Sequence, residues 1–444
     1  MANLTDIRNT AISGLTHIDA LLNTGPDWNF LTPASNTLYF TFELDKSNAR
    51  EAEAVTSTAE FGNAQKAASR TAMAYLEQVT GIHFVETQDP AQAHLHLWAG
   101  DLVSDTAAGL CQWHQSYRYA QDGTLTQFDA QAWIYIDNAR YAAELAKMAP
   151  GTGAYQVLLH ELGHALGLKH PFDGDITLPA IDDNKLNTLM SYTSRGPLAA
   201  EYRPYDLAAL NWLYGGDGLG GELGLNSGGG QYLAGTVRDD VLKTGAAADV
   251  LEGLGGNNKF DGGGNLDVAL YGDSRGNHTI VKSGDGYKVS AIAGNYGTDE
   301  LLNVERLAFS DANVALDVDG IAGQAYRMYQ AALGRAPDAG GLGYWIEMMD
   351  RGMTLRELAA NFMATQEFIG KFGGSNPEDA VFVTKVYNNV LHRTPDNDGF
   401  KYFMDTLAAG NSKIDMLAAF SESPENQAQL IGVIGNGIDY QPYV

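Results

Sequence analysis

The chain has 444 residues, of which 45% are hydrophobic and 10% aromatic, so it can build several hydrophobic cores. Its formal net charge of −26 repels phosphate backbones and excludes nucleic acid as a favoured partner. One cysteine allows no intrachain disulfide, and no apolar stretch is long enough for a transmembrane helix.

Residues 1–215 mix strand and helix signals, which favours an α+β domain in a multidomain chain. Alternating or aromatic runs predict strands, and apolar residues at helical spacing predict helices. The strands are expected at 38–44, 94–100 and 132–137, and the helices at 62–79 and 155–168.

The last of these helices begins a segment with three histidines that can share one metal ion. His160 and His164 are four residues apart and therefore lie on one helical face. Gly167 accepts the positive φ of a chain reversal, which returns His170 to the same ion. Three neutral imidazoles leave an open position for water, as catalytic zinc requires. Glu161 stands beside the first ligand, where it can act as general base toward that water.

These residues resemble a known clan of zinc peptidases. HELGHALGLKH (160–170) followed by LMSY (189–192) is similar to the metzincins, and the proline after His170 and the tyrosine two residues after Met190 are similar to the serralysin branch. The resemblance implies a catalytic domain of a twisted mixed sheet with helices, and a turn that places Met190 beneath the zinc. It also implies that Tyr192 binds zinc at rest and then stabilises the oxyanion.

Two other features of this part have simpler interpretations. His94 and His96 share one face of a predicted strand, and we expect an exposed or cleft-facing polar pair rather than a second metal site. Cys111 is expected to be an ordinary buried cysteine. The alternative is a thiolate that blocks the zinc, as in some metzincin proenzymes.

Residues 216–318 are rich in glycine, which favours short strands and turns over helices. Four residues recur at nine-residue spacing: Asp240, Asp249, Asn258 and Asp267. This period resembles the RTX β-roll, in which Ca²⁺ lies between turns, and it implies one or a few structural calcium ions at these residues. Full glycine-rich loops are missing, so a calcium-free β-solenoid or sandwich is the alternative.

Residues 319–430 contain a duplicated helical unit. LGRAPDAGGLGYW (333–345) matches LHRTPDNDGFKYF (391–403) at an offset of 58 residues. The two Arg-x-Pro-Asp segments, 335–338 and 393–396, are expected to start and cap helices. The unit resembles a domain of unknown function from secreted and surface-layer-associated bacterial proteins. Its two interpretations are a helical spacer and a binding module for a cell surface or glycan.

The N-terminus lacks the basic and apolar segments of a secretory signal. Residues 431–444 are expected to form a loosely ordered tail, and the RTX resemblance implies a C-terminal signal for a type I secretion apparatus. The sequence therefore predicts a secreted zinc-dependent endopeptidase acting on protein or peptide substrates. The alternatives are a surface-associated protease or adhesin dedicated to one partner, such as a surface-layer protein, and a structural zinc protein without catalysis.

Overall fold

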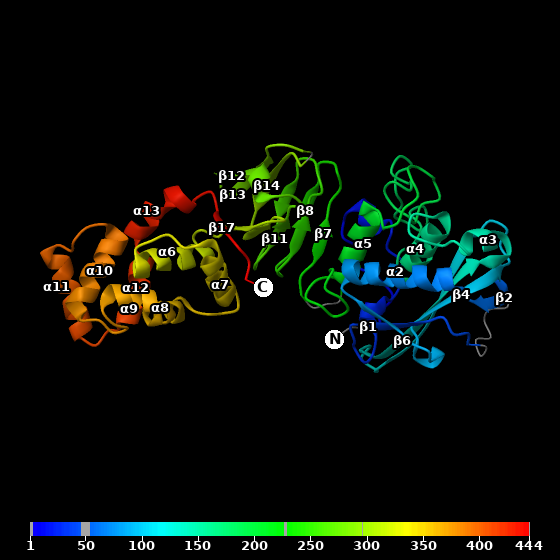
Figure 1. Ribbon diagram of the computed structural model, residues 1–444, viewed down its shortest axis with the longest axis horizontal. Coiled ribbons are helices and arrows are strands. Elements are labelled where there is room, and N and C mark those ends of the chain that lie inside the picture. The colour runs from blue at the N-terminus through cyan, green and yellow to red at the C-terminus, as the bar shows by residue number, and fades with distance from the viewer. Residues whose placement is uncertain (1–2, 46–53, 226–228, 295, 444) are drawn as a thin grey trace. The chain divides into compact units, whose positions relative to one another are not determined.

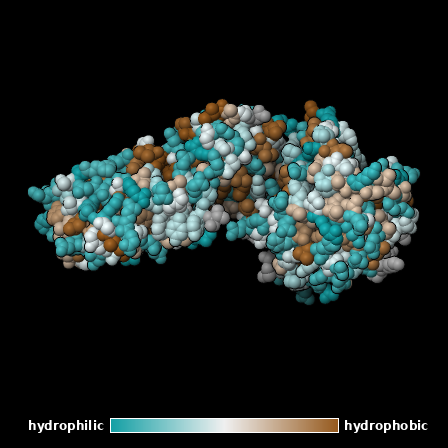
Figure 2. Space-filling view, viewed as in Figure 1, coloured by the Kyte–Doolittle hydropathy of each residue, from teal (hydrophilic) through white to brown (hydrophobic). Residues whose placement is uncertain are grey.

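The computed structural model describes residues 3–45, 54–225, 229–294 and 296–443. The chain forms two compact units, one of residues 1–236 and 247–252 and the other of residues 237–246 and 253–444 (Figure 1). On the face drawn in Figure 2, hydrophilic residues are spread widely and hydrophobic residues form small separate groups. Within the described ranges, no helix is long and apolar enough to cross a membrane.

The first unit is built around a six-stranded mixed sheet of order β3-β1-β4-β6-β5, with β2 paired to β4. The mutually parallel strands are β1 (Thr37–Thr41), β3 (His83–Glu86), β4 (Leu95–Leu102) and β6 (Leu125–Asp137). The antiparallel strands are β2 (Val55–Glu60) and β5 (Gly109–Tyr119). Strand β4 is buried at every position except Asp101, as expected for a central strand.

Five helices accompany this sheet: α1 (Thr16–Asp19), α2 (Asn63–Thr80), α3 (Asn138–Leu145), α4 (Gly153–Ala165) and α5 (Pro204–Tyr214). Helix α4 packs against β5 and β6. Its leucines Leu158, Leu159 and Leu162 are fully buried. The apolar face of α4 thereby fixes the helix on the sheet and leaves its histidine-bearing face toward a cleft.

The strand β5 is absent from the sequence prediction, which also places the start of β6 seven residues too late, at 132 instead of 125. The absence of a sequence signal for β5 has a physical reason. β5 is an edge strand with partly or fully exposed side chains, so it lacks the alternation that marks a half-buried strand. This edge strand nevertheless lies against α4.

The glycine-rich region consists of short strands, as its composition predicts. In the first unit, β7 (Tyr232–Ala234) pairs in parallel with β9 (Val250–Glu252). In the second unit, β8 (Val241–Lys243) pairs in parallel with β10 (Lys259–Asp261). Residues linked across both pairs are 18 positions apart, for example Gln231 with Asp249 and Asp240 with Asn258. Two nine-residue steps therefore separate each strand from its neighbour.

The other strands of the second unit include antiparallel pairings. Strands β10, β14, β13 and β12 are neighbours in one sheet, as are β11, β15, β16 and β17 in another. Their bounds are β11 (Val268–Leu270), β12 (His278–Ser283), β13 (Gly286–Ala291), β14 (Thr298–Leu302), β15 (Arg306–Ala308), β16 (Asn313–Ala315) and β17 (Ile438–Tyr440). The middle of the chain is thus β-rich.

Eight helices form the C-terminal region, in two sets of four. The first four are α6 (Ile321–Leu333), α7 (Ala339–Asp350), α8 (Leu355–Ala364) and α9 (Gln366–Phe372). The second four are α10 (Asp379–Leu391), α11 (Asn397–Ala408), α12 (Lys413–Ser421) and α13 (Pro424–Ile434). Each helix of the second set begins 58 residues after its counterpart. The side chains of Asp338 and Asp396 cap α7 and α11, as the Arg-x-Pro-Asp segments predict.

The expectation of a loosely ordered tail at 431–444 is wrong for much of its length. Helix α13 extends to Ile434, and β17 pairs antiparallel with β16. Ile438 and Tyr440 are 3% and 7% exposed. These two apolar residues alternate on one strand face and are buried against the second unit, which holds this end of the chain in place.

Candidate metal centre

Helix α4 ends in a turn that reverses the chain immediately after its second histidine. The Gly167 amide donates to the His164 carbonyl at 3.1 Å, and the Leu168 amide donates to the Gly163 carbonyl at 2.9 Å. This pair of bonds is the Schellman motif, which requires a left-handed residue, and Gly167 has φ +95°. The indole of Trp113 donates to the His164 carbonyl at 3.0 Å. The helix end is therefore fully hydrogen-bonded and fixed.

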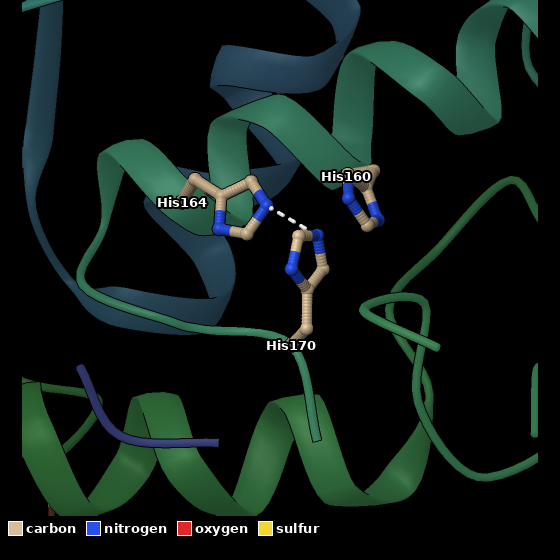
Figure 3. Close-up of side chains that lie close together, drawn as sticks. All are labelled: His160, His164 and His170. Carbon is tan, nitrogen blue, oxygen red and sulfur yellow. Dashed lines mark hydrogen bonds between the residues drawn. The ribbon is translucent and has the colours of Figure 1, made fainter. Parts of the chain in front are cut away.

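The reversal brings three imidazoles together (Figure 3). One ring nitrogen from each of His160, His164 and His170 lies within 4.8 Å of the other two. Figure 3 shows His160 and His164 on the same helix, with His170 reaching up from the returning chain. In the described part of the chain, this is the one group of three or more His, Cys, Asp or Glu side chains close enough to hold a metal ion.

Each imidazole is oriented by an oxygen on its Nδ1 atom. The Nδ1 of His160 lies 2.8 Å from the Leu189 carbonyl, and that of His164 lies 2.9 Å from the Leu168 carbonyl. The Nδ1 of His170 lies 2.9 Å from Asp173 Oδ2. With the proton on Nδ1, each ring presents the lone pair of its Nε2, which is how neutral histidine binds a metal.

The donor set fits a cation such as zinc. The Nε2 atoms of His164 and His170 are 3.1 Å apart, and two lone pairs at that distance repel unless a positive charge lies between them. Burial lowers the pKa of His160 to about 3 and that of His164 to about 4. Both rings are therefore neutral near pH 7, the protonation state that a metal ligand requires.

Glu161 is held in the wall of the same cleft. It is 5% exposed, and burial raises its pKa to about 8. Its side chain lies directly against Gly109 at the start of β5, where any larger residue would collide with it. Nearby on β5, burial and the Glu161 charge raise the pKa of Cys111 well above its usual value. Cys111 does not belong to the group of side chains that, among the described residues, lie close enough to share a metal ion, which disfavours its alternative role as a zinc-blocking thiolate.

The chain segment with Met190 packs against the helix that carries His160 and His164. Met190 is fully buried. A Cβ atom added to Gly163 would lie only 2.8 Å from the Met190 sulfur. The glycine in the helix therefore makes room for the methionine. The turn is anchored by Asp206, whose carboxylate accepts from the Leu189 amide at 2.8 Å and the Thr188 hydroxyl at 2.5 Å.

Tyr192 lies on the open side of the three histidines. Its ring is 65% exposed, and its centroid is 4.7 Å from that of His170. Phe172 stacks on His170 at 5.1 Å with the two planes 8° apart. A cleft of about 260 Å³ opens beside these residues. Its walls include His160, Glu161, Tyr192, Gly109, Gln156 and Lys185.

The four residues expected to bind calcium do not form a carboxylate cluster in the described part of the chain. Asp249 Oδ1 instead accepts from the Gln231 amide at 2.7 Å, and Asn258 Oδ1 accepts from the Asp240 amide at 3.0 Å. The Asp267 amide donates to Glu305 at 2.9 Å. In the first two contacts, a side chain 18 residues further along the chain thus accepts a hydrogen bond from a backbone amide.

The expectation that His94 and His96 form an exposed or cleft-facing pair is wrong for His96, which is 1% exposed. Its ring stacks on Trp133 at 4.7 Å. The Nδ1 of His94 accepts from the Tyr39 amide at 2.9 Å. His94 directly precedes β4 and its ring contacts Trp28 and Tyr39, whereas His96 lies within β4 and contacts Trp98 and Trp133, so aromatic residues surround both rings.

The sequence analysis did not predict four residues of the site: Gly109, Asp173, Lys185 and Asp206. Asp173 has a local signal, since it follows His170 by three residues. The others come from β5, from the segment before the methionine turn and from α5, so only the folded chain brings them to the cleft.

Comparison with known proteins agrees with this geometry. Residues 47–200 match the metallo-peptidase family M12B, reprolysin-like. Residues 324–372 and 359–430 match a domain of unknown function (DUF4214). The chain therefore carries a reprolysin-like metallopeptidase domain with a three-histidine metal-binding group, followed by a C-terminal domain of unknown function.

The related proteins are serralysins and similar metallopeptidases. The chain is 27% identical to serralysin of Photorhabdus laumondii over 54% of its own length and 53% of that protein's. It is 26% identical to metallopeptidase AprA of Pseudomonas marginalis over 62% and 59%, and 24% identical to serralysin C of Dickeya chrysanthemi over 64% and 63%. The match thus spans about half the length of the first of these relatives.

Proposed function

We propose that this chain is a zinc-dependent endopeptidase that hydrolyses peptide bonds of protein substrates. The observation that carries the proposal is the convergence of His160, His164 and His170, with every Nδ1 held by an oxygen and every Nε2 free to face one point. Such second partners fix the ring orientation and raise the basicity of metal ligands. A fold without a metal would have little reason to orient three neutral rings in this way.

Zinc held by the three Nε2 atoms would supply a Lewis acid that acidifies water and polarises a carbonyl oxygen. Glu161 is the group placed to take the proton from that water. Its buried position raises its affinity for a proton, while a nearby dication favours the carboxylate, so it can both accept and release one. We assign it the delivery of this proton to the leaving amine.

Tyr192 and Met190 have supporting roles in the proposal. Tyr192 lies beside His170 on the open side, where its hydroxyl can reach a substrate carbonyl oxygen or become a further zinc ligand in the resting enzyme. Met190 fills the space beneath α4 that Gly163 leaves, and the neighbouring Leu189 carbonyl orients His160. Gly167 provides the reversal that returns His170.

In this proposal, the parts outside the catalytic domain serve the export of the chain and its attachment to a cell surface or glycan. We assign 1–215 to catalysis, 216–318 to a β-roll-like domain, 319–430 to a duplicated helical domain and 431–444 to an export signal. The 18-residue parallel offset supports the β-roll assignment. The expected partners are a type I secretion apparatus, which would export the chain, and a cell surface or glycan, to which residues 319–430 would attach. Loss of export on deletion of 431–444 tests the first of these.

Calcium in the glycine-rich domain is a separate part of the proposal. The side-chain contacts of Asp249 and Asn258 favour the calcium-free alternative for their own turns, because their oxygens already accept backbone hydrogens. Calcium ligation by Asp240, Asp249, Asn258 and Asp267 together is the other arrangement, and unfolding measured with and without calcium decides between the two.

The test is metal analysis coupled to casein hydrolysis. The purified chain should bind one zinc ion, lose hydrolysis on chelation and regain it on zinc addition. Glu161→Gln should lower hydrolysis by about 10²–10⁴-fold while zinc binding is retained. Glu144→Gln, at an exposed position of α3, is the matched control. Hydrolysis that survives Glu161→Gln, or a chain without zinc, would overturn the proposal.

A further inference from the structure

A lysine lines the proposed catalytic cleft. Lys185 belongs to the same cleft wall as His160, Glu161 and Tyr192. Its side chain is partly buried, and its backbone is fixed by a bond from its amide to the Thr193 carbonyl at 2.9 Å. The methionine turn between these two residues therefore holds the lysine at the cleft. The same loop carries the Leu189 carbonyl that orients His160.

The ammonium group of Lys185 has no carboxylate partner among the described residues. Glu161 lines the same cleft, but burial alone raises the pKa of Glu161, without a contribution from the lysine. Lys169 makes a useful contrast, since its ammonium donates to three backbone carbonyls, those of Ala20, Asp173 and Ile176. Lys169 is thus a structural lysine, whereas Lys185 keeps its charge available in the cleft.

An unpaired cation at this position is notable in a chain with a net charge of −26. A surface of that sign repels anionic substrates at long range. A single positive charge at the reacting centre attracts a negative group only when that group lies close to the scissile bond. Partial burial strengthens this attraction, because less water and salt screen it.

We infer that Lys185 is a specificity-determining residue that selects peptides with a carboxylate next to the scissile bond. The inference rests on the proposed peptidase function and deepens it. The carboxylate can come from an aspartate or glutamate side chain within the peptide, or from a free C-terminus. Both sources present the same charge and the same acceptor oxygens to the ammonium group.

The experiment uses the zinc-loaded chain and fluorogenic peptides of one parent sequence. Alanine, glutamate or lysine is placed in turn at each position around the cleaved bond, and each peptide is made with a free and an amidated C-terminus. For wild type, kcat/KM should be highest for glutamate at one position. Lys185→Met should lower the glutamate-to-alanine ratio about fivefold, a magnitude typical of a partly exposed ion pair.

Further variants separate charge from folding. Lys185→Arg should keep the preference, and Lys185→Glu should move it toward lysine-containing peptides. Lys147→Met, at an exposed position in the same unit, should leave the ratio unchanged. Because each ratio is taken within one protein, a general loss of active enzyme cancels. A fall in kcat/KM on amidation that Lys185→Met abolishes would assign the carboxylate to the C-terminus, and a glutamate preference that persists in the amidated peptides would assign it to a side chain.

Binding provides a readout without turnover. Calorimetric titration of Glu161→Gln with the preferred glutamate peptide should give weaker binding when Lys185→Met is added, and no change for the alanine peptide. Equal ratios in wild type, Lys185→Met and Lys185→Glu, while all three cleave peptides, would overturn the inference alone. A wild-type chain that cleaves none of the peptides would instead overturn the proposed function.

Discussion

A Cβ atom on Gly109 would stand 2.6 Å from both the Cγ and the Oε1 atom of Glu161. Gly109 opens the edge strand β5, and Glu161 lies on α4, so the absence of a side chain on the strand sets where the carboxylate sits. The backbone of Gly109 does not require glycine on conformational grounds, since its φ is not positive. The requirement is one of space alone.

Gly109→Ala should therefore displace Glu161 while leaving the fold and the metal group in place. A misplacement near 1 Å in a catalytic group costs about a hundredfold in rate. We expect kcat/KM for casein-derived peptides to fall by that order, with zinc content and thermal midpoint close to wild type. Gly153→Ala, in α4 itself with open space around the new methyl, is the control. A fully active Gly109→Ala would show that the carboxylate position is not set by this contact.

Asp173 holds the third histidine through the Nδ1 atom of His170 at 2.9 Å. Removing such a partner lowers metal affinity by about 10–100-fold. Because the Asp173 side chain is 55% exposed, water can replace part of its role. We expect Asp173→Ala to weaken zinc binding about tenfold, measured by competition with a zinc-binding dye at neutral pH. Asp175→Ala, two residues further along and also exposed, should bind zinc like wild type.

The sequence predicted those features that depend on residues close together in the chain. The i, i+4 histidines, the glycine reversal and the return of His170 all lie within eleven residues of sequence, and the structure brings these rings together. The 58-residue repeat likewise appears as matching helices. Tyr329 contacts Phe362 with ring centroids 4.8 Å apart, and Tyr387 contacts Phe420 at 5.3 Å.

The residues that the sequence did not reveal depend on contacts between distant segments. β5 is an exposed edge strand, so its hydrophobic pattern is weak, yet it places Gly109 against α4. Asp206 anchors the methionine turn from a helix that starts fourteen residues after it. The strand at 438–440 pairs with residues 313–315, more than a hundred positions away. No local pattern specifies such partners.

His96 should make stability depend on pH. Burial lowers its pKa from 6.5 to about 4, with smaller effects from Asp45 and His94. Between these values the unfolded chain binds a proton that the folded chain does not, so the free energy of unfolding falls as pH drops through this window. The full window corresponds to roughly 3 kcal/mol.

His96→Phe keeps the ring stacked on Trp133 and removes the titrating group. We expect its thermal midpoint to exceed that of wild type increasingly as pH falls from 7 to 5, in chelator-treated samples where the zinc ligands contribute equally. His392→Asn, at an exposed residue with φ +51°, is the control, because asparagine tolerates that conformation. A constant difference between wild type and His96→Phe at all pH values would contradict the assignment.

Asn258 links three parts of the glycine-rich region. Its Oδ1 accepts from the Asp240 amide at 3.0 Å, while its amide and Nδ2 both donate to Asp299 Oδ1. Asn258→Ala leaves a buried carboxylate and a backbone amide short of partners, which costs about 1–3 kcal/mol per group. We expect urea unfolding of the second unit to shift to lower concentration by a corresponding amount, with or without calcium.

The calcium dependence of the same measurement decides what holds these turns together. If side-chain contacts do, EGTA and added calcium should give the same unfolding midpoint for wild type, with zinc kept in excess. Asn397→Ala, at an exposed position of α11, should unfold like wild type. A urea midpoint that rises with calcium, together with an Asn258→Ala variant whose midpoint calcium restores, would show that a bound ion and not the Asn258 contacts stabilises these turns.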